Sequence, residues 1–498
     1  MKQLLAALLV LLPASIRAGE QAQPARPNIV FILADDIGYG DIVCQGATHA
    51  KTLHLDRLAA QGCRFTDAHS PASTCTPTRR AFLTGTYSWR QQAGSSIAPG
   101  DAPLSIPPGT STVASLLKSA GYRTGVVGKW HVGLGPESGP DWNGQIKPGP
   151  LEIGFDSAFI MAATGDRVPT VYVQDHAVLG LDPNDPIRVS YKQKVGDEPT
   201  GRDHPELLKL KHTHGHDMTI VNGIGRIGWM TGGKSARWID EEMSDTFVKH
   251  AVEFIETSRE QPFFLFFASH DVHVPRVPHP RFKGTSGVGT RGDVIQELDD
   301  AVGTLLGTLD RLHLADNTLV IFTSDNGGVM DDGYEDVGRF DYHPNAPLRG
   351  SKGTLFEGGH RVPFFARWPG HIPAGSTSGA LMAHLDMPAT LAALVGAKVP
   401  PGQCVDSVNV LPALLGDSAV GRTDFVAHVG GTQGPFALRS GDWKYISPAG
   451  GAGGKAATVP QLYNLASDLA EERNLADPQS DKLREMQTLL AKIRGVEK

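Results

Sequence analysis

The chain has 498 residues, of which 40% are hydrophobic and 20% charged, a composition typical of a globular protein with a sizeable core. This length suits one large α/β domain with an appendage, or two or three smaller domains. The formal net charge is −7, from 46 basic and 53 acidic residues, and the sequence has no long basic run. We therefore do not expect nucleic-acid binding.

Residues 1–18 are typical of a signal peptide. Lys2 supplies a positive charge, residues 4–12 are apolar, and residues 16–18 form a poor but usable cleavage site. The apolar stretch is shorter than the roughly 20 residues that a membrane-spanning helix needs. We expect an exported protein, periplasmic or secreted, without a transmembrane segment once the leader is removed. The alternative is that these residues form an apolar first strand.

Export implies an oxidising compartment, yet the cysteines are too few and too scattered for a disulfide framework. The chain has four of them, Cys44, Cys63, Cys75 and Cys404. A bridge between Cys44 and Cys63 is one alternative that the sequence leaves open.

Apolar runs alternate with helical patterns along the first 398 residues. The run at 28–34 predicts a strand buried on both faces of a parallel sheet. Similar runs at 122–127, 263–268 and 318–323 alternate with helical patterns at 111–120, 243–258 and 292–312. This alternation predicts an α/β fold, with a large mostly parallel sheet flanked by helices, in a domain of residues 26–398.

The segment 73–85 reads S-T-C-T-P-T-R-R-A-F-L-T-G. Pro77 has a fixed φ and no N–H, so it suits the first turn of a helix that stops at Gly85. Cys75 would then lie at a helix N-terminus, where free N–H groups and the helix dipole favour anions. The alternative is a buried structural cysteine before an ordinary helix.

Two later regions do not follow the alternation of apolar runs and helical patterns. Residues 164–236 are long, polar and histidine-rich with few regular elements, and loops of this length are usually functional or disordered. From residue 399 the chain has shorter strands, at 436–439 and 443–446, and an amphipathic helix at 480–493. We expect residues 399–498 to form a smaller antiparallel β-sheet plus helix subdomain.

Hard oxygen groups follow two of the expected strands. Asp35 and Asp36 follow the first, and Asp325 and Asn326 follow the strand at 318–323. Since ligands bind beyond the carboxyl ends of strands in open α/β sheets, the two pairs could face one pocket. Carboxylate and amide oxygens suit calcium or magnesium rather than zinc, although each pair read alone is more typical of turns.

Cationic or imidazole side chains occur in three further segments. Lys129 and His131 follow one expected strand, His273 follows another, and Lys352 lies downstream of Asp325. A single lysine or histidine is usually a solvated or satisfied polar group, so none of them is a site by itself.

Together these motifs, from residue 27 to about 475, resemble the type I sulfatases of the alkaline phosphatase superfamily, most closely the arylsulfatase-like members. The resemblance rests on C-x-P-x-R followed by L-T-G, on the two oxygen pairs, and on the K-x-H, H-x-P and K-G-T-x-x-E-G-G segments. It implies that Cys75 is oxidised to formylglycine (3-oxoalanine) by a formylglycine-generating system. It also implies a calcium ion on Asp35, Asp36, Asp325, Asn326 and the modified Cys75. Thr78 departs from the pattern, since many members have serine there.

The resemblance further implies catalytic roles. Arg79 matches the arginine that orients the formylglycine, and Lys129 and Lys352 would neutralise charge on the sulfate. His273 would protonate the leaving oxygen, and His131 would take a proton from the second hydroxyl of the hydrated aldehyde so that sulfate is released.

The expected function is hydrolysis of sulfate monoesters, on a sulfated carbohydrate rather than a simple aryl compound. Asp166, Arg167, His216 and Asp217 in the polar loop are candidates for binding sugar hydroxyls, and 6-sulfated galactose or N-acetylgalactosamine is the first substrate to try. Zinc binding by the histidines of 212–217 is a weaker alternative. Two other functions stay open, a phosphomonoester or phosphonate monoester hydrolase and a non-catalytic glycan-binding protein.

Overall fold

The computed structural model describes residues 26–49, 51–211, 215–330, 340–448 and 459–496. The predicted signal peptide, 1–18, lies outside the described residues and stays a prediction. None of the helices within these ranges is long and apolar enough to cross a membrane.

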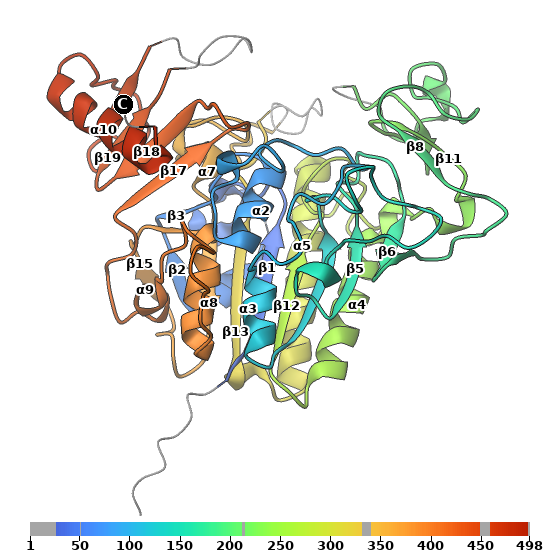
Figure 1. Cartoon of the computed structure of the whole chain (residues 1–498), viewed down its shortest axis with the longest axis horizontal. Coiled ribbons are helices and arrows are strands. Elements are labelled where there is room, and N and C mark those ends of the chain that lie inside the picture. The colour runs from blue at the N-terminus through green and yellow to red at the C-terminus, as the bar shows by residue number, and fades with distance from the viewer. Residues whose placement is uncertain (1–25, 50, 212–214, 331–339, 449–458, 497–498) are drawn as a thin grey trace, which may run out of the picture.

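A ten-stranded sheet forms the centre of the molecule (Figure 1). Its strands in spatial order are β15 (Ser376–Ser378), β2 (Cys63–Phe65), β14 (Phe364–Arg367), β13 (Thr318–Ser324), β1 (Asn28–Ala34), β12 (Phe263–Ala268), β4 (Arg123–Lys129), β5 (Ser157–Met161), β6 (Tyr172–Gln174) and β7 (Ala177–Val178). β13, β1, β12, β4 and β5 are parallel, whereas β14, β6 and β7 each run antiparallel to a neighbour. The sheet is therefore mixed, with the predicted parallel strands at its centre.

Helices cover both faces of this sheet. Alternate residues of β1 point to opposite faces, and the residues on both faces are buried. Ile29, Phe31 and Leu33 belong to the core shared with one set of helices, and Val30 and Ile32 to the core shared with the other. The first set is α2 (Cys75–Thr84), α3 (Val113–Ser119) and α8 (Met387–Val395), and the second is α1 (Leu53–Ala60), α4 (Met243–Ser258) and α5 (Gly289–Arg311). The prediction of a sheet flanked by helices is confirmed.

The C-terminal part forms a second sheet with its own core, beside α2 and the short helix α7 (Glu357–His360) in Figure 1. It contains β17 (Asp424–His428), β18 (Phe436–Ser440), β19 (Trp443–Ile446) and β20 (Gln461–Asn464), all antiparallel, with α10 (Ser480–Arg494). The predicted small antiparallel sheet with a helix is confirmed. The preceding helix α9 (Leu411–Leu415) packs in the core of the main sheet, so the boundary at 398/399 stays a prediction.

Short strand pairs complete the described structure. They are β3 (Ala68–His69) with β16 (Met382–Ala383), β8 (Arg188–Ser190) with β11 (Trp229–Thr231), and β9 (Ile220–Val221) with β10 (Ile224–Gly225). The last two pairs lie in the polar region 164–236, which also contributes β6 and β7 to the main sheet and so has more regular structure than the sequence predicts. In Figure 1, β8 and β11 lie away from the main sheet, at the upper right.

Candidate active site

The two oxygen pairs meet at the carboxyl end of the parallel strands. Hydrogen bonding continues past the strand ends, since the Asp35 amide donates to the Asp271 carbonyl at 3.0 Å and the Asp325 amide donates to the Ala34 carbonyl at 3.0 Å. Asp36 adopts a left-handed conformation with φ of 60°, which is uncommon for a residue other than glycine. The loops therefore bring both pairs into one buried cluster, as the sequence predicts.

α2 carries Cys75 and Arg79 to this cluster. Cys75 is the first residue of the helix and Arg79 lies one turn later, so the two side chains share a face. The Arg79 guanidinium binds Asp325 Oδ2 through Nε at 2.9 Å and Nη2 at 2.8 Å, and it donates to the Lys129 carbonyl at 2.9 Å. This fully buried arginine fixes the helix against two strand ends.

The Cys75 side chain lies in the middle of the charged groups. Its Sγ is within 4.8 Å of ligand atoms of Asp35, Asp36 and His273. Burial raises the pKa of the Cys75 thiol to about 11, although Lys129 and Lys352 act in the opposite direction. An unmodified thiol here would be largely protonated at neutral pH and a weak nucleophile.

Two lysines pair with the first two carboxylates. Lys129, the last residue of β4, contacts Asp35 and lies 3.7 Å from Asp325 Oδ2. Lys352 Nζ binds both oxygens of Asp36, at 2.6 and 2.8 Å. With Arg79, three cations face three buried carboxylates. Burial and the neighbouring Asp35 raise the pKa of Asp325, since repulsion between the carboxylates persists.

The oxygen groups fit a hard divalent cation. Asn326 Nδ2 donates to Asp36 Oδ1 at 2.7 Å, which leaves the amide oxygen of Asn326 free to coordinate. Among the described residues, the buried Asn326 Oδ1 and Asp35 Oδ1 have no hydrogen-bond partner. Buried acceptors without a partner are costly, and an oxygen-preferring cation such as calcium would satisfy them.

The two histidines differ in which nitrogen faces the protein. The His273 Nδ1 donates to the Val274 carbonyl at 2.7 Å, and its Nε2 lies 3.9 Å from Asp36. The His131 Nε2 donates to the Ala98 carbonyl at 3.0 Å, so its buried Nδ1 is the acceptor in the neutral ring. Burial lowers the pKa of both rings well below the usual value, with further contributions from Lys352 at His273 and from Lys129 at His131.

Three of the four loop residues proposed for sugar binding form one cluster. Asp166 binds Arg167 at 2.9 Å and His216 at 3.1 Å. Although burial opposes ionisation, Arg167 and His216 hold the pKa of Asp166 well below its usual range. Asp217 instead forms a two-point ion pair with Arg202, at 2.8 and 3.1 Å. His212 and His214, in the zinc alternative, lie outside the described residues.

Sequence reasoning missed the support beneath this cluster. The buried Arg226 binds both oxygens of Asp240, at 2.9 and 2.7 Å, and donates to the carbonyl of Gly165. The pair thereby fixes the turn that presents Asp166 and Arg167. Arg226 and Asp240 belong to no local pattern, so only the tertiary structure identifies them.

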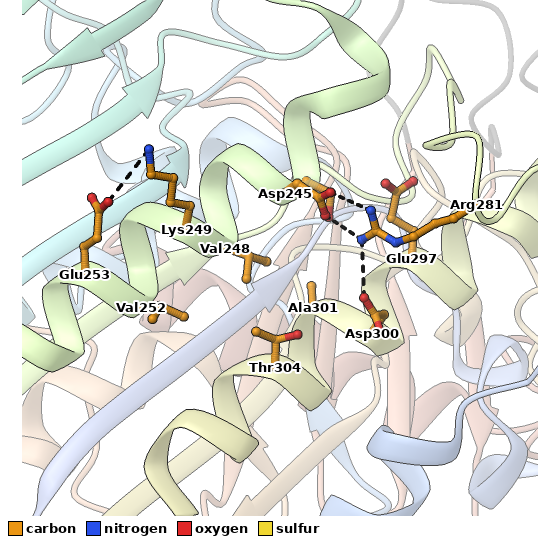
Figure 2. Close-up of a pocket in the computed structure, with 11 residues that line it drawn as sticks. Asp245, Val248, Lys249, Val252, Glu253, Arg281, Glu297, Asp300, Ala301 and Thr304 are labelled. Atoms are coloured by element: carbon orange, nitrogen blue, oxygen red, sulfur yellow. Dashed lines mark hydrogen bonds and ion pairs between the residues drawn. The ribbon is translucent and has the colours of Figure 1, made fainter. Parts of the chain in front are cut away.

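A groove lies away from this site, between α4 and α5 (Figure 2). It has a volume of about 340 Å³, is lined by apolar side chains such as Val248 and Val252, and is bordered by ion pairs of Arg281. None of the predicted site residues lines it.

All four cysteines are unbridged, so the Cys44–Cys63 alternative is not realised.

Comparison with known proteins agrees with this geometry. Residues 27–397 match the Sulfatase family model. The chain is 48% identical over 487 residues to N-acetylgalactosamine-6-O-sulfatase of Bacteroides thetaiotaomicron, covering 96% of this chain and 94% of the relative. It is 33% identical over 467 residues to human arylsulfatase A, covering 90% and 83%.

The same relationship is seen in three dimensions. A solved structure connected with glycosaminoglycan metabolism by Bacteroides thetaiotaomicron superposes with a TM-score of 0.92 at 48% identity, covering 95% of this chain and all of that one. The family match and the curated sulfatase relatives together support a sulfatase over the phosphoester hydrolase and the non-catalytic binding protein. The chain belongs to the sulfatase family, and it is a sulfuric ester hydrolase.

Proposed function

We propose that this sulfatase removes 6-O-sulfate from N-acetylgalactosamine or galactose residues of a glycan, as an exported or periplasmic enzyme. The observation that carries the proposal is the arrangement around Cys75, where Arg79, Lys129 and Lys352 surround one buried position beside His273. The N-acetylgalactosamine-6-O-sulfatase relative, similar over almost the whole of both chains, supports the choice of sugar and position.

The family implies two groups that the chain must acquire. Asp35, Asp36, Asp325, Asn326 and the modified Cys75 would hold a calcium ion, which would neutralise negative charge on the sulfate. Formylglycine, made from Cys75 by a formylglycine-generating system, would supply the oxygen nucleophile that a buried thiol lacks. The unpartnered oxygens of Asp35 and Asn326 support the ion, and the raised pKa of Cys75 supports the need for modification.

The chain's own cations bind the sulfate group. Lys129 and Lys352 are fixed by Asp35 and Asp36, so they are preorganised to interact with anionic oxygens. In a site without bulk water, such preorganised charges stabilise the charge that develops as the sulfur–oxygen bond breaks. Arg79 holds the first turn of α2 and orients the side chain at position 75.

His273 is the proposed general acid. Its Nδ1 is engaged by the Val274 carbonyl, so only Nε2 can exchange a proton with substrate. An anionic sulfate ester bound beside Nε2 favours the protonated ring, which then donates its Nε2 proton to the departing sugar oxygen. His131, with Nδ1 as its acceptor, is the proposed base that takes up a proton when sulfate is released.

The polar loop is the proposed sugar subsite. The ion-paired Asp166 and Arg167 offer acceptors and donors in fixed directions, and His216 extends the same cluster. Although burial opposes it, the charge of Asp166, and to a smaller extent that of an ionised Cys75, raises the pKa of Arg167, which supports the placement of Arg167 beside the substrate. We assign Asp217 to the rim of this subsite.

The test is sulfate release from 6-O-sulfo-N-acetylgalactosamine, its 4-O-sulfo isomer and the matching 6-phosphate. We expect turnover of the 6-sulfate at least 100-fold above both others in kcat/KM. Arg167→Gln should raise KM for the 6-sulfated sugar, whereas Arg188→Gln, an exposed arginine on β8, should not. Turnover of an aryl sulfate without any turnover of the sulfated sugars would overturn the carbohydrate assignment.

A further inference from the structure

A buried lysine of the C-terminal sheet lies at the centre of an ion network that reaches the main domain. Lys444, on β19, is fully buried. Its Nζ contacts Glu357 Oε1 at 2.9 Å, Glu471 Oε1 at 2.8 Å and His360 Nε2 at 3.2 Å. Glu357 and His360 belong to α7 in the main domain, so Lys444 joins the two parts of the molecule.

The same network holds both ends of the loop that carries Lys352. At its C-terminal end, the Glu357 amide donates to Glu471 Oε2 at 2.6 Å. At its N-terminal end, the Arg349 guanidinium donates to the Glu471 carbonyl and lies 3.9 Å from the centre of the Phe356 ring. Lys352 lies between these two anchors.

This loop is hydrogen-bonded directly to the segments of the active site. The Gly353 amide donates to the Ser73 carbonyl at 2.8 Å, two residues before Cys75. The Lys352 amide donates to the Gly328 carbonyl at 3.2 Å, just after the oxygen pair of Asp325 and Asn326. A shift of the loop would therefore move the Lys352 ammonium relative to Asp36 and to position 75.

The charges make Lys444 hard to replace. Without it, the Glu357 and Glu471 carboxylates would face each other in a buried site. Glu357 would keep its pair with Arg361 at 3.1 Å and a contact of 4.0 Å with Arg439. Removing one partner of a buried ion pair is strongly destabilising. Although burial opposes ionisation, Lys444 is the main reason that the pKa of Glu357 lies well below its usual range.

His69, Glu357 and His360 have the separations of a metal site. However, the Lys444 ammonium already provides the cation there.

We propose that Lys444 is a positioning residue for catalysis, which acts by holding the 349–357 loop so that Lys352 faces the sulfate group. The kinetic part rests on the proposed function. The structural part, the order of the loop, does not.

The structural part is tested by hydrogen exchange in Lys444→Met, Lys444→Arg and Lys492→Met, the last being an exposed lysine of α10 on the same subdomain. We expect amides of 349–361 to exchange at least tenfold faster in Lys444→Met, with 263–274 unchanged. Lys444→Arg should restore most of the protection, and Lys492→Met should have no effect. Unchanged exchange in 349–361, or an equal increase in both segments, would overturn the proposal. If Lys444→Met does not fold, the proposal is decided by the same comparison of exchange in 349–361 and 263–274, made on Glu471→Gln.

The kinetic part is tested by a double-mutant cycle with Lys352→Ala. Lys444→Met should lower kcat/KM for the sulfated sugar at least tenfold in the wild-type background and less than twofold in the Lys352→Ala background, because it acts through Lys352. Equal losses in both backgrounds would overturn this route of action. If the wild-type enzyme turns over no sulfate ester, the proposed function fails, while the exchange result still decides whether Lys444 orders the loop.

Discussion

At the scale of single residues, the charges around position 75 matter more than the thiol that the gene encodes there. Burial raises the pKa of the Cys75 thiol to about 11, and a protonated thiol is a weak nucleophile. Arg79, Lys129 and Lys352 are nevertheless arranged around it as they would be for an anionic substrate. This contrast is explained if the functional side chain is formylglycine.

His273 can be tested through its dependence on the leaving group. A general acid typically contributes about 10²–10⁴ when the leaving oxygen is a poor leaving group, and little when it is already acidic. We expect His273→Ala to lower kcat/KM by about that factor on the sulfated sugar, but by less than about tenfold on an aryl sulfate with an acidic phenol. Steady-state kinetics on both substrates measures the difference.

The control for this experiment is His371→Ala, an exposed histidine that stacks on Trp368. It should leave both reactions unchanged. An equal loss on both substrates in His273→Ala would contradict proton donation to the leaving oxygen and would leave sulfate binding as its role.

The sequence identified residues whose neighbours form a recognisable local pattern. Asp35 and Asp36 follow an apolar strand, and so do Asp325 and Asn326, which is why their convergence could be predicted. Lys444 lies in an ordinary strand, and its partners are separated from it along the chain. No periodicity or motif links such residues, so the network became visible only in the structure.

At the scale of helices and strands, burial pattern explains both the predictions and the omissions. The run 28–34 is apolar throughout because β1 is covered on both faces, and the predicted strand has the same bounds. On one side of the sheet, the strands β15, β2 and β14 have only three or four residues each. Segments this short carry no measurable alternation, so the antiparallel pairing of β14 with β13 and β2 could not be predicted.

The end of α2 tests how firmly the helix that carries Cys75 is held. Gly85 adopts φ of 61°, and a Cβ there would lie 2.8 Å from Cys404 Cβ. Gly396 ends α8 in the same left-handed conformation, but a Cβ there would meet nothing within 4 Å. We expect Gly396→Ala to cost about 1 kcal/mol from backbone strain alone, and Gly85→Ala to cost about 1–3 kcal/mol more because of overpacking.

Denaturant unfolding of the two variants measures this difference. Equal stability losses would show that the contact with Cys404 relaxes freely. Activity of Gly85→Ala should fall as well if the position of α2 sets that of Cys75 and Arg79, whereas Gly396→Ala should retain it.

At the scale of the whole molecule, the C-terminal sheet supports the active site. The Ser73 amide donates to the His428 carbonyl at 2.9 Å, and the Thr74 hydroxyl donates to the Val429 carbonyl at 2.6 Å. The segment before Cys75 is therefore fixed by the end of β17, and the loop of Lys352 by β19 and Glu471. The two sets of contacts join the C-terminal sheet to residues more than 80 positions away in the sequence, and no local sequence pattern predicts contacts over such separations.

Buried neutral histidines predict a loss of stability in acid. Burial lowers the pKa of His270 and of His428 to about 4 and that of His384 to about 3. Between the unfolded pKa of about 6.5 and these values, the unfolded chain binds more protons than the folded one, so stability falls as pH falls. One such histidine contributes about 3 kcal/mol of this loss when its folded pKa is about 4.

His428→Gln should make the decrease in Tm between pH 7 and pH 4.5 smaller, because one of these groups is removed. Thermal unfolding across that range, with the exposed His371→Gln as control, measures the change. An unchanged pH dependence in His428→Gln would contradict a buried neutral ring at this position.

The most direct test of the whole account is the mass of the tryptic peptide 65–79, which contains Cys75, from protein produced in its own host. The account predicts a mass about 18 Da below the cysteine form, since oxidation to the aldehyde replaces SH and H by oxygen. Peptide 58–64, which contains Cys63, should keep its thiol in the same digest. An intact thiol at Cys75 in every copy of active enzyme would contradict the account, because the proposed nucleophile would then be absent.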